Sequence, residues 1–220
     1  MQIIENHYQQ SVIKTLYRSE IGVRCVLQLE DRSIVKLTDS YSEAVFGSRL
    51  LLNPNKQCLP IVDIVHRRHK GMNQFWLHQP ELTVLNSDEM DGMTQCMKTV
   101  GMGQVGYDEA ELEEKLLLID KQWHAMLQSV NKAAIHHRSI GNRSLDLHAG
   151  NIGYYEGRTV LFDQSSVMIE GLLRQSCHQK PKFQLEDHLT WHQFQALKGG
   201  GRFSEITTGV STPRASLEPS

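Results

Sequence analysis

Short apolar runs separated by polar breaks dominate the first third of the chain, and this pattern is typical of β-strands. Residues 23–29 and 33–37 are β-branched and aliphatic runs divided by a polar trio, so they predict an antiparallel hairpin. Residues 59–65 and 73–77 predict two further strands around a polar turn at 66–71. The pattern therefore predicts a small antiparallel sheet.

One short helix is expected within this sheet region. Residues 41–52 follow the capping pair Asp39-Ser40 and stop before Pro54, which predicts a helix between the second and third strands. The pattern then breaks at 79–82, and the segment up to Gly106 is rich in glycine, methionine and polar residues, as a linker would be. We place a boundary between two lobes at residue 85.

A long amphipathic helix is predicted over residues 108–134. Asp108 and Glu111 form a capping box at its start. Apolar side chains recur at helical spacing along one face, namely Leu112, Leu116, Ile119, Trp123, Met126, Val130 and Ala134. This stripe is typical of a core-facing helix that supports a neighbouring site.

The last part of the chain predicts one more helix and then a tail. Apolar residues within 185–197 recur at helical spacing before three glycines, and the segment 199–220 is too polar to bury much surface. We therefore expect three segments: 1–85, a sheet with a short helix; 86–198, a hinge segment and a helical lobe; and 199–220, a disordered tail. The fold class is α+β.

Composition narrows the kind of protein. The chain has 220 residues, of which 40% are hydrophobic and 22% charged, with a formal net charge of -2. That charge gives no electrostatic reason to expect a nucleic acid or a membrane as partner. There is no apolar run of membrane-spanning length, and four cysteines are scattered without a CxxC pair, so we expect a cytoplasmic protein.

Three oxygen-bearing side chains form the main candidate site. Asp146 and Asn151 lie five positions apart in the segment Ser144–Gly153, and Asp163 ends the apolar run that follows Gly157. In kinase-type phosphoryl transfer one aspartate receives the proton of the acceptor hydroxyl, while an asparagine and a second aspartate hold magnesium. The alternative is a helix cap, a turn amide and a strand-end carboxylate, each common alone.

Two charged residues near the start of the chain are weaker candidates. Lys36 shares a strand face with Ile34, so it could reach nucleotide phosphates, although this pattern alone favours a lysine that extends to solvent. Glu43 falls in the first turn of the helix at 41–52, where the helix dipole by itself favours a carboxylate. It is a candidate partner for Lys36.

The loop Asp-Leu-His-Ala-Gly-Asn at 146–151 resembles the catalytic loop of the protein-kinase-like superfamily. It is similar to the loop of small-molecule kinases and of the early Ser/Thr protein kinases of T7-like bacteriophages. The phage kinases look closest, because Ser144-Leu145 precede the aspartate here. The order of predicted elements over roughly residues 15–170 is also similar. The resemblance implies a two-lobed fold, with a β-sheet N-lobe and a reduced, mainly helical C-lobe.

The resemblance also implies roles for individual residues, with ATP and magnesium as cofactors. Asp146 would be the catalytic residue, and Asn151 and Asp163 the metal ligands. The nucleotide side would comprise Lys36, Glu43, Gly22, Glu81 and Leu82. The chain departs from the family at the nucleotide-covering loop, where Gly22 stands without a second nearby glycine, and in the short spacing between Lys36 and Glu43.

Three functions remain open at this stage. The first is a phage-encoded Ser/Thr protein kinase that phosphorylates host proteins in the host cytoplasm. The hydroxyls of its C-terminal tail are then candidate sites of self-phosphorylation, with a plain flexible tail as the alternative. The second, motivated by the missing glycines, is an inactive, pseudokinase-like protein that binds a host factor. The third is a small-molecule kinase, which the His148-Ala149-Gly150 form of the loop favours but the short segment after Asp163 leaves little room for.

Overall fold

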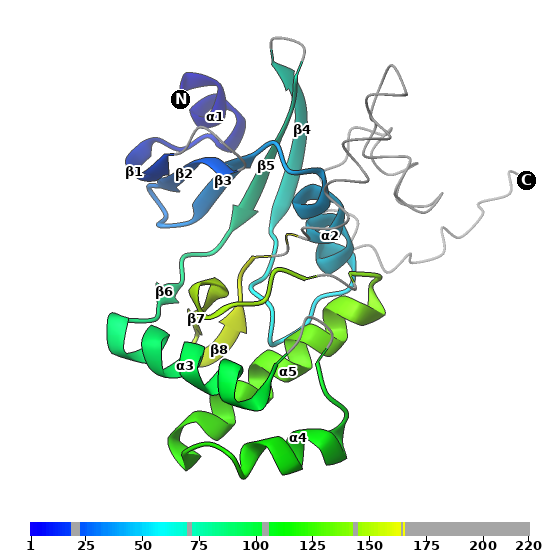
Figure 1. Cartoon of the computed structure of the whole chain (residues 1–220). Helices are drawn as coiled ribbons and strands as arrows, with labels where there is room; N and C mark the ends of the chain where they lie inside the picture. Colours follow the sequence, from blue (N-terminus) through cyan, green and yellow to red (C-terminus); the bar gives the residue numbers. More distant parts are fainter. Residues whose placement is uncertain (19–22, 70–71, 103–105, 143–144, 164, 166–220) are drawn as a thin grey trace, which may run out of the picture.

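A computed structural model describes residues 1–18, 23–69, 72–102, 106–142, 145–163 and 165. A five-stranded antiparallel sheet lies at one end of the molecule, and helices α3, α4 and α5 lie at the other (Figure 1). A small three-stranded sheet lies between these two parts. This arrangement confirms a mixed α and β fold with an antiparallel sheet, whereas the two-lobed description and the boundary at residue 85 stay predictions.

The larger sheet has the strand order β1-β2-β3-β5-β4. Its strands are β1 (Val12–Arg18), β2 (Val23–Leu29), β3 (Ile34–Thr38), β4 (Asp63–His69) and β5 (Met72–Gln79). The β2–β3 hairpin confirms the pairing predicted from the apolar runs, with Leu27 opposite Val35. Both edge strands are reached by hairpins, and this brings β3 to the centre of the sheet.

The predicted strand at 59–65 and the predicted turn at 66–71 are wrong in their bounds. β4 begins at Asp63, and its pairing with β5 continues through His66–Phe75 and Arg67–Gln74 as far as His69–Met72. The ladder is made by backbone groups, so polar side chains on an edge strand do not end it. The polar composition of this segment therefore predicts a turn that begins at residue 66, although the strand continues to His69.

Two elements at the start of the chain were not predicted. Helix α1 (Gln2–Tyr8) and strand β1 cover and extend the sheet. Ile4 of α1 packs with four buried residues of one sheet face, Leu27, Leu29, Val35 and Trp76. A helix of seven residues is too short to produce a clear periodic signal, so its position depends on this packing.

Helix α2 (Tyr41–Leu52) has the bounds predicted from its sequence. The Ser40 side chain caps it by accepting a hydrogen bond from the Glu43 N–H at 3.2 Å. The helix packs against the other face of the sheet, where Phe75 and Leu77 of β5 are buried. Because α2 directly follows β3, its first turn lies beside the end of the central strand.

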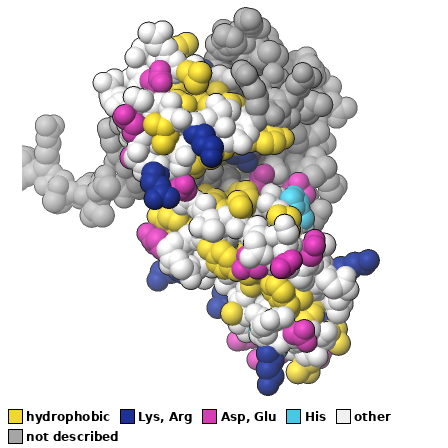
Figure 2. Space-filling view, turned by 90° about the vertical axis from the view of Figure 1, so that its left-hand side faces the viewer, with side chains coloured by type: hydrophobic (Ala, Val, Ile, Leu, Met, Phe, Trp, Pro, Cys, Tyr) yellow, Lys and Arg dark blue, Asp and Glu magenta, His cyan; other side chains and the backbone are white. Residues whose placement is uncertain are grey.

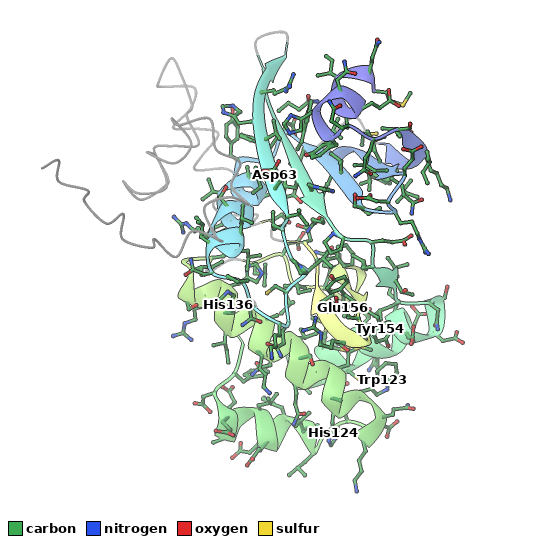
Figure 3. All side chains as sticks on the ribbon, turned by 180° about the vertical axis from the view of Figure 1, so that it is seen from behind. Asp63, Trp123, His124, His136, Tyr154 and Glu156 are labelled. Carbon is green, nitrogen blue, oxygen red and sulfur yellow. The ribbon has the colours of Figure 1, made fainter. Side chains whose placement is uncertain are left out.

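The smaller sheet joins distant parts of the chain. Its order is β6 (Thr83–Val84), β7 (Ile152–Tyr155) and β8 (Arg158–Leu161), and Tyr154 and Glu156 mark the β7–β8 hairpin in Figure 3. A Cβ on Gly153 would lie 2.3 Å from Leu82 Cδ1 and 2.8 Å from the Thr83 carbonyl oxygen. A glycine at 153 therefore lets β6 approach β7.

The segment predicted as a linker contains a capped helix instead, α3 (Ser87–Val100). Its N-terminus is a capping box in which the Asn86 side chain accepts from the Glu89 N–H and the Glu89 carboxylate accepts from the Asn86 N–H, each at 2.9 Å. Met93, Cys96, Met97 and Val100 form its buried stripe. Thioether and thiol side chains are apolar, so this stripe was a helical signal that the polar composition concealed.

The helix predicted over 108–134 is also wrong as a single element. It is divided into α4 (Glu109–Leu116), a short 3₁₀-helix η1 (Lys121–Trp123) and α5 (His124–Ser139). The Leu118 N–H bonds to the Lys115 carbonyl at 3.0 Å, which tightens the chain into an i+3 turn and ends α4. Asp108 does cap α4, accepting from the Glu111 N–H at 2.9 Å.

One large buried core runs through the molecule from the sheet to the helices. It includes Phe75 and Leu77 of the sheet, Leu127 and Val130 of α5, and Leu145 at the start of the candidate loop. None of the helices in the described part of the chain has the length and apolar character needed to cross a membrane. The helix predicted within 185–197 and the tail at 199–220 lie outside the described residues.

Candidate active site

The loop that carries Asp146 and Asn151 is folded onto the segment that carries Asp163. The Asn151 Nδ2 donates to the Asp146 carbonyl oxygen at 2.8 Å, and the Asp146 N–H donates to the Ser165 carbonyl oxygen at 3.0 Å. The Phe162 N–H in turn donates to the Asn151 carbonyl oxygen at 3.0 Å. These three bonds hold the two segments of the predicted site together.

The three predicted oxygen-bearing residues differ in exposure. Asn151 lies at the end of the 3₁₀-helix η2 (Ala149–Asn151) and is buried, whereas the Asp146 side chain is 45% exposed. The Asp163 side chain is 18% exposed. Asp146 is therefore the member of the set that a dissolved molecule reaches most readily.

Lys36 is buried beside two carboxylates. Its ammonium is in contact with the Glu43 carboxylate of α2 and lies 3.3 Å from Asp163 Oδ2. Lys36 itself is 8% exposed, so the expectation that it extends to solvent is wrong. The short spacing between Lys36 and Glu43 does not prevent their ion pair, because α2 begins immediately after β3.

The electrostatics of this cluster favour the charged forms of Lys36 and Asp163, whereas burial raises the pKa of the Glu43 carboxyl although the Lys36 ammonium opposes this. Burial alone lowers the pKa of Lys36, but the Glu43 and Asp163 carboxylates outweigh burial and hold that pKa above its ordinary value. Burial raises the pKa of Asp163, but the Lys36 ammonium and the Ser165 N–H, 2.8 Å from Oδ1, bring it below its ordinary value. One ammonium is thus shared between two buried carboxylates.

The residues of this cluster come from two different parts of the molecule. Figure 2 shows a hollow between the sheet-bearing part and the helical part of one face, with basic and acidic side chains at its rim. Strand β3 contributes Lys36 from the sheet, and the chain beyond β8 contributes Asp163 from the other part. The structure therefore brings Asp146, Asn151, Asp163, Lys36 and Glu43 into one connected site.

Glu81 and Leu82, predicted on the nucleotide side, lie between β5 and β6. The Glu81 carboxylate accepts from Gln28 Nε2 at 2.8 Å and lies 2.8 Å from Arg32 Nη2, so it connects this segment to the β2–β3 hairpin. The Leu82 side chain lies against Gly153. Gly22, the remaining predicted residue, lies outside the described residues.

The donor set is suited to magnesium. The Asn151 Nδ2 is engaged with the Asp146 carbonyl, which leaves its Oδ1 as the atom to offer a ligand. Asp163 adds carboxylate oxygens, and Mg²⁺ takes oxygen ligands from one or two side chains together with phosphate oxygens. Asn151 and Asp163 are therefore the residues of this site that could hold such an ion.

Two residues of the site carried no signal in the sequence. Ser165 acts through its backbone carbonyl and N–H, which any residue type possesses. His137 of α5 is 0% exposed, and among the described residues neither of its ring nitrogens has a hydrogen-bond partner. Burial lowers the pKa of His137, and Asp163 opposes this to a smaller extent, so the ring belongs to the surroundings of the site.

Comparison with known proteins gives a coarse structural likeness. No protein-family model matches the chain, and no curated protein matches it. Among the solved structures that match is the MAP kinase LmaMPK10 from Leishmania major, with 14% sequence identity and a TM-score of 0.40. The match covers 73% of this chain and 48% of that one, so the chain spans about half the length of that structure.

Proposed function

We propose that this protein is an ATP- and magnesium-dependent phosphotransferase that transfers a phosphoryl group to an alcohol. The observation that supports the proposal best is the buried contact of Lys36 with both Glu43 and Asp163. In protein kinases a strand lysine pairs with a glutamate of the following helix and serves the nucleotide phosphates, beside a metal-binding aspartate. A structural ion pair has no need of the second carboxylate, so the trio favours a phosphate site.

Each residue has a role in this proposal. Lys36 contacts the α- and β-phosphates, and Glu43 orients its ammonium. Asn151 and Asp163 hold magnesium, which when bound neutralises charge on the phosphates. Asp146 orients the acceptor hydroxyl and accepts its proton late in the transfer, and its exposure leaves room for that acceptor.

The substrate class follows from the sequence resemblance. We infer a Ser/Thr protein kinase of phage origin that acts on host proteins in the host cytoplasm, because the loop with Ser144-Leu145 before Asp146 is most similar to that group. The serines and threonines of the segment 199–220 are candidate sites of self-phosphorylation. Intact mass before and after incubation with ATP tests this, and an unchanged mass would remove it.

The main experiment compares ATP turnover and nucleotide binding in four proteins. Wild type and Asp91→Asn, which alters an exposed carboxylate of α3, should release or transfer the γ-phosphate in the presence of Mg²⁺. Asp146→Asn should lose roughly 10²- to 10⁴-fold in rate while Mg-ATP still raises its melting temperature. Lys36→Met should lose both the turnover and the thermal shift.

The result that contradicts the proposal is equally clear. If wild type shows no metal-dependent loss of γ-phosphate, alone or with host lysate, the enzyme assignment fails. If Asp146→Asn turns over ATP like wild type, the assignment of the catalytic residue fails. Equal losses in Asp91→Asn and Asp146→Asn would show that the effect is not local to the site.

A second candidate is a binding protein that uses this fold without chemistry. One observation favours it: both Asp163 oxygens already have partners within the chain, Oδ2 with Lys36 and Oδ1 with the Ser165 N–H. Such a site is stable without a ligand. Thermal melting separates the two candidates, because a protein that binds no nucleotide shows no rise in melting temperature with Mg-ATP.

A further inference from the structure

An open groove lies directly beside Asp146, between the end of α3 and the loop that follows the aspartate. It has a volume of about 410 Å³, and Met97 and Lys98 of α3 face Leu147 and His148 of the loop across it. His148 Nε2 lies 3.9 Å from Asp146 Oδ2. A molecule seated in this groove therefore contacts His148, the neighbour of the carboxylate assigned to the acceptor hydroxyl.

The walls of the groove are apolar and adaptable. Met97, Met102 and Leu147 line it, together with Ala149. Methionine side chains are unbranched and fit differently shaped apolar partners. This lining favours an apolar side chain as one part of the occupant.

One positive charge in the groove is not used by the protein. Lys98 is exposed and forms no ion pair within the described part of the chain. The carbonyl groups at the end of α3 already accept hydrogen bonds from other donors. The Gly101 N–H donates to the Lys98 carbonyl, the Met102 N–H to the Met97 carbonyl, and the Tyr107 hydroxyl to the Val100 carbonyl. The ammonium is therefore available to an anionic group.

We propose that this groove binds the residues that flank the acceptor hydroxyl of a peptide substrate, and that it selects an apolar residue and an acidic residue there. The proposal rests on the proposed function, since it names the substrate of the same site. A groove that is open along one side receives an extended segment of another chain without enclosing it. The Lys98 ammonium and the apolar wall then contact two different side chains of that segment.

The test measures binding without nucleotide, so it does not depend on catalysis. The probes are three fluorescent peptides with a central serine flanked on each side by leucine, followed by glutamate, glutamine or lysine. By fluorescence anisotropy at low salt, wild type should bind the glutamate peptide about two- to fivefold more tightly than the glutamine peptide, as expected for an exposed ion pair, and the lysine peptide most weakly. High salt should reduce the preference.

Two charge reversals locate the effect. Lys98→Glu should reverse the preference between the glutamate and lysine peptides, whereas Lys132→Glu, which reverses an exposed charge of α5 outside the groove, should leave it unchanged. Met102→Ser should weaken the binding of all three peptides by the same factor. Circular dichroism and melting temperature verify that each variant is folded.

Three outcomes would overturn the proposal: no measurable binding of any peptide, equal binding of all three by wild type, or equal effects of the two lysine variants. Failure of the phosphotransferase assignment gives a different result, namely no ATP turnover while peptide selection by Lys98 persists. The two conclusions are therefore tested independently.

Discussion

His137 is a buried residue whose charge state affects stability. Its ring is fully buried, and both of its nitrogens lack hydrogen-bond partners within the part of the chain that the structure describes. Burial, with a smaller contribution from His136, lowers the pKa of His137 from 6.5 to about 4, although Asp163 opposes this. The ring is therefore neutral in the folded protein at neutral pH.

This burial predicts a pH dependence of the free energy of unfolding. Between pH 6.5 and pH 4 the unfolded chain binds a proton on His137 that the folded protein does not bind. Stability is therefore fully present above pH 6.5 and falls as the pH is lowered, by about 3 kcal/mol at most. Replacing His137 with leucine should remove this part of the pH dependence, which urea unfolding at pH 7.5, 6 and 5 measures.

A matched variant separates His137 from the other histidines. His148 is exposed, so His148→Gln should keep the wild-type dependence on pH. If the free energy of unfolding falls with pH equally in wild type and in His137→Leu, the assignment of this effect to the buried ring is contradicted.

Among the elements, the β7–β8 hairpin uses two glycines for different reasons. Gly157 has φ of 72° and open space around its Cβ position, whereas Gly153 has no room for a Cβ next to Leu82 and Thr83. Gly157→Ala should lower the free energy of unfolding by about 1 kcal/mol, because alanine is strained in this left-handed backbone conformation. Gly153→Ala should lower the free energy of unfolding by about 1–3 kcal/mol, because the backbone of β6 must move.

Hydrogen exchange distinguishes these two effects. Gly153→Ala should lose amide protection in β6 and in its partner β7, since the pairs Thr83–Tyr154 and Val84–Gly153 would separate. Gly157→Ala should keep β6 protected. If the two variants lose protection in β6 equally, the steric explanation for Gly153 is wrong.

The helical elements also depend on close packing. A Cβ on Gly92 of α3 would lie 2.2 Å from the ring of Trp123, which Figure 3 places at the helical end of the molecule. The sequence showed Trp123 on the apolar stripe of a long helix. Its partner Gly92 lies in the segment predicted as a linker, since a glycine in a polar segment gives no helical signal.

At the scale of the whole molecule, α2 is connected to α5. Arg49 Nη1 donates to the Ile140 carbonyl at 2.7 Å, and His136 Nε2 lies 2.9 Å from the Asn53 carbonyl oxygen. Helix α2 carries Glu43, and α5 leads toward the loop with Asp146. These contacts therefore fix the two sides of the site relative to each other.

Removal of the Arg49 donor should weaken this connection. Arg49→Met keeps an unbranched stem but leaves the Ile140 carbonyl without that bond, so the free energy of unfolding should fall by about 1–3 kcal/mol. Amide exchange should rise both in α2 and at the end of α5. Arg138→Met changes an exposed residue of α5 and should leave the free energy of unfolding nearly unchanged. Equal losses of stability in the two variants, measured by guanidinium unfolding, would contradict the role given to Arg49.

Local sequence determined the elements whose signals repeat within a few residues. The bounds of α2, the β2–β3 hairpin and the cap of α4 follow from spacing, capping residues and turn composition, all of which act over a single turn or hairpin. The same is true of Asp146 and Asn151, which lie five positions apart in one loop. Their hydrogen bond could be anticipated because the chain between them is short.

Tertiary structure alone decided which polar groups are buried and with what partners. Lys36 meets Asp163 across 127 positions of sequence, and the cost of burying its charge is offset only when that partner and Glu43 are present. The packing of α3 against Trp123 through Gly92 was likewise not visible in the local pattern. A local pattern fixes periodicity, whereas burial depends on contacts that the order of residues does not reveal.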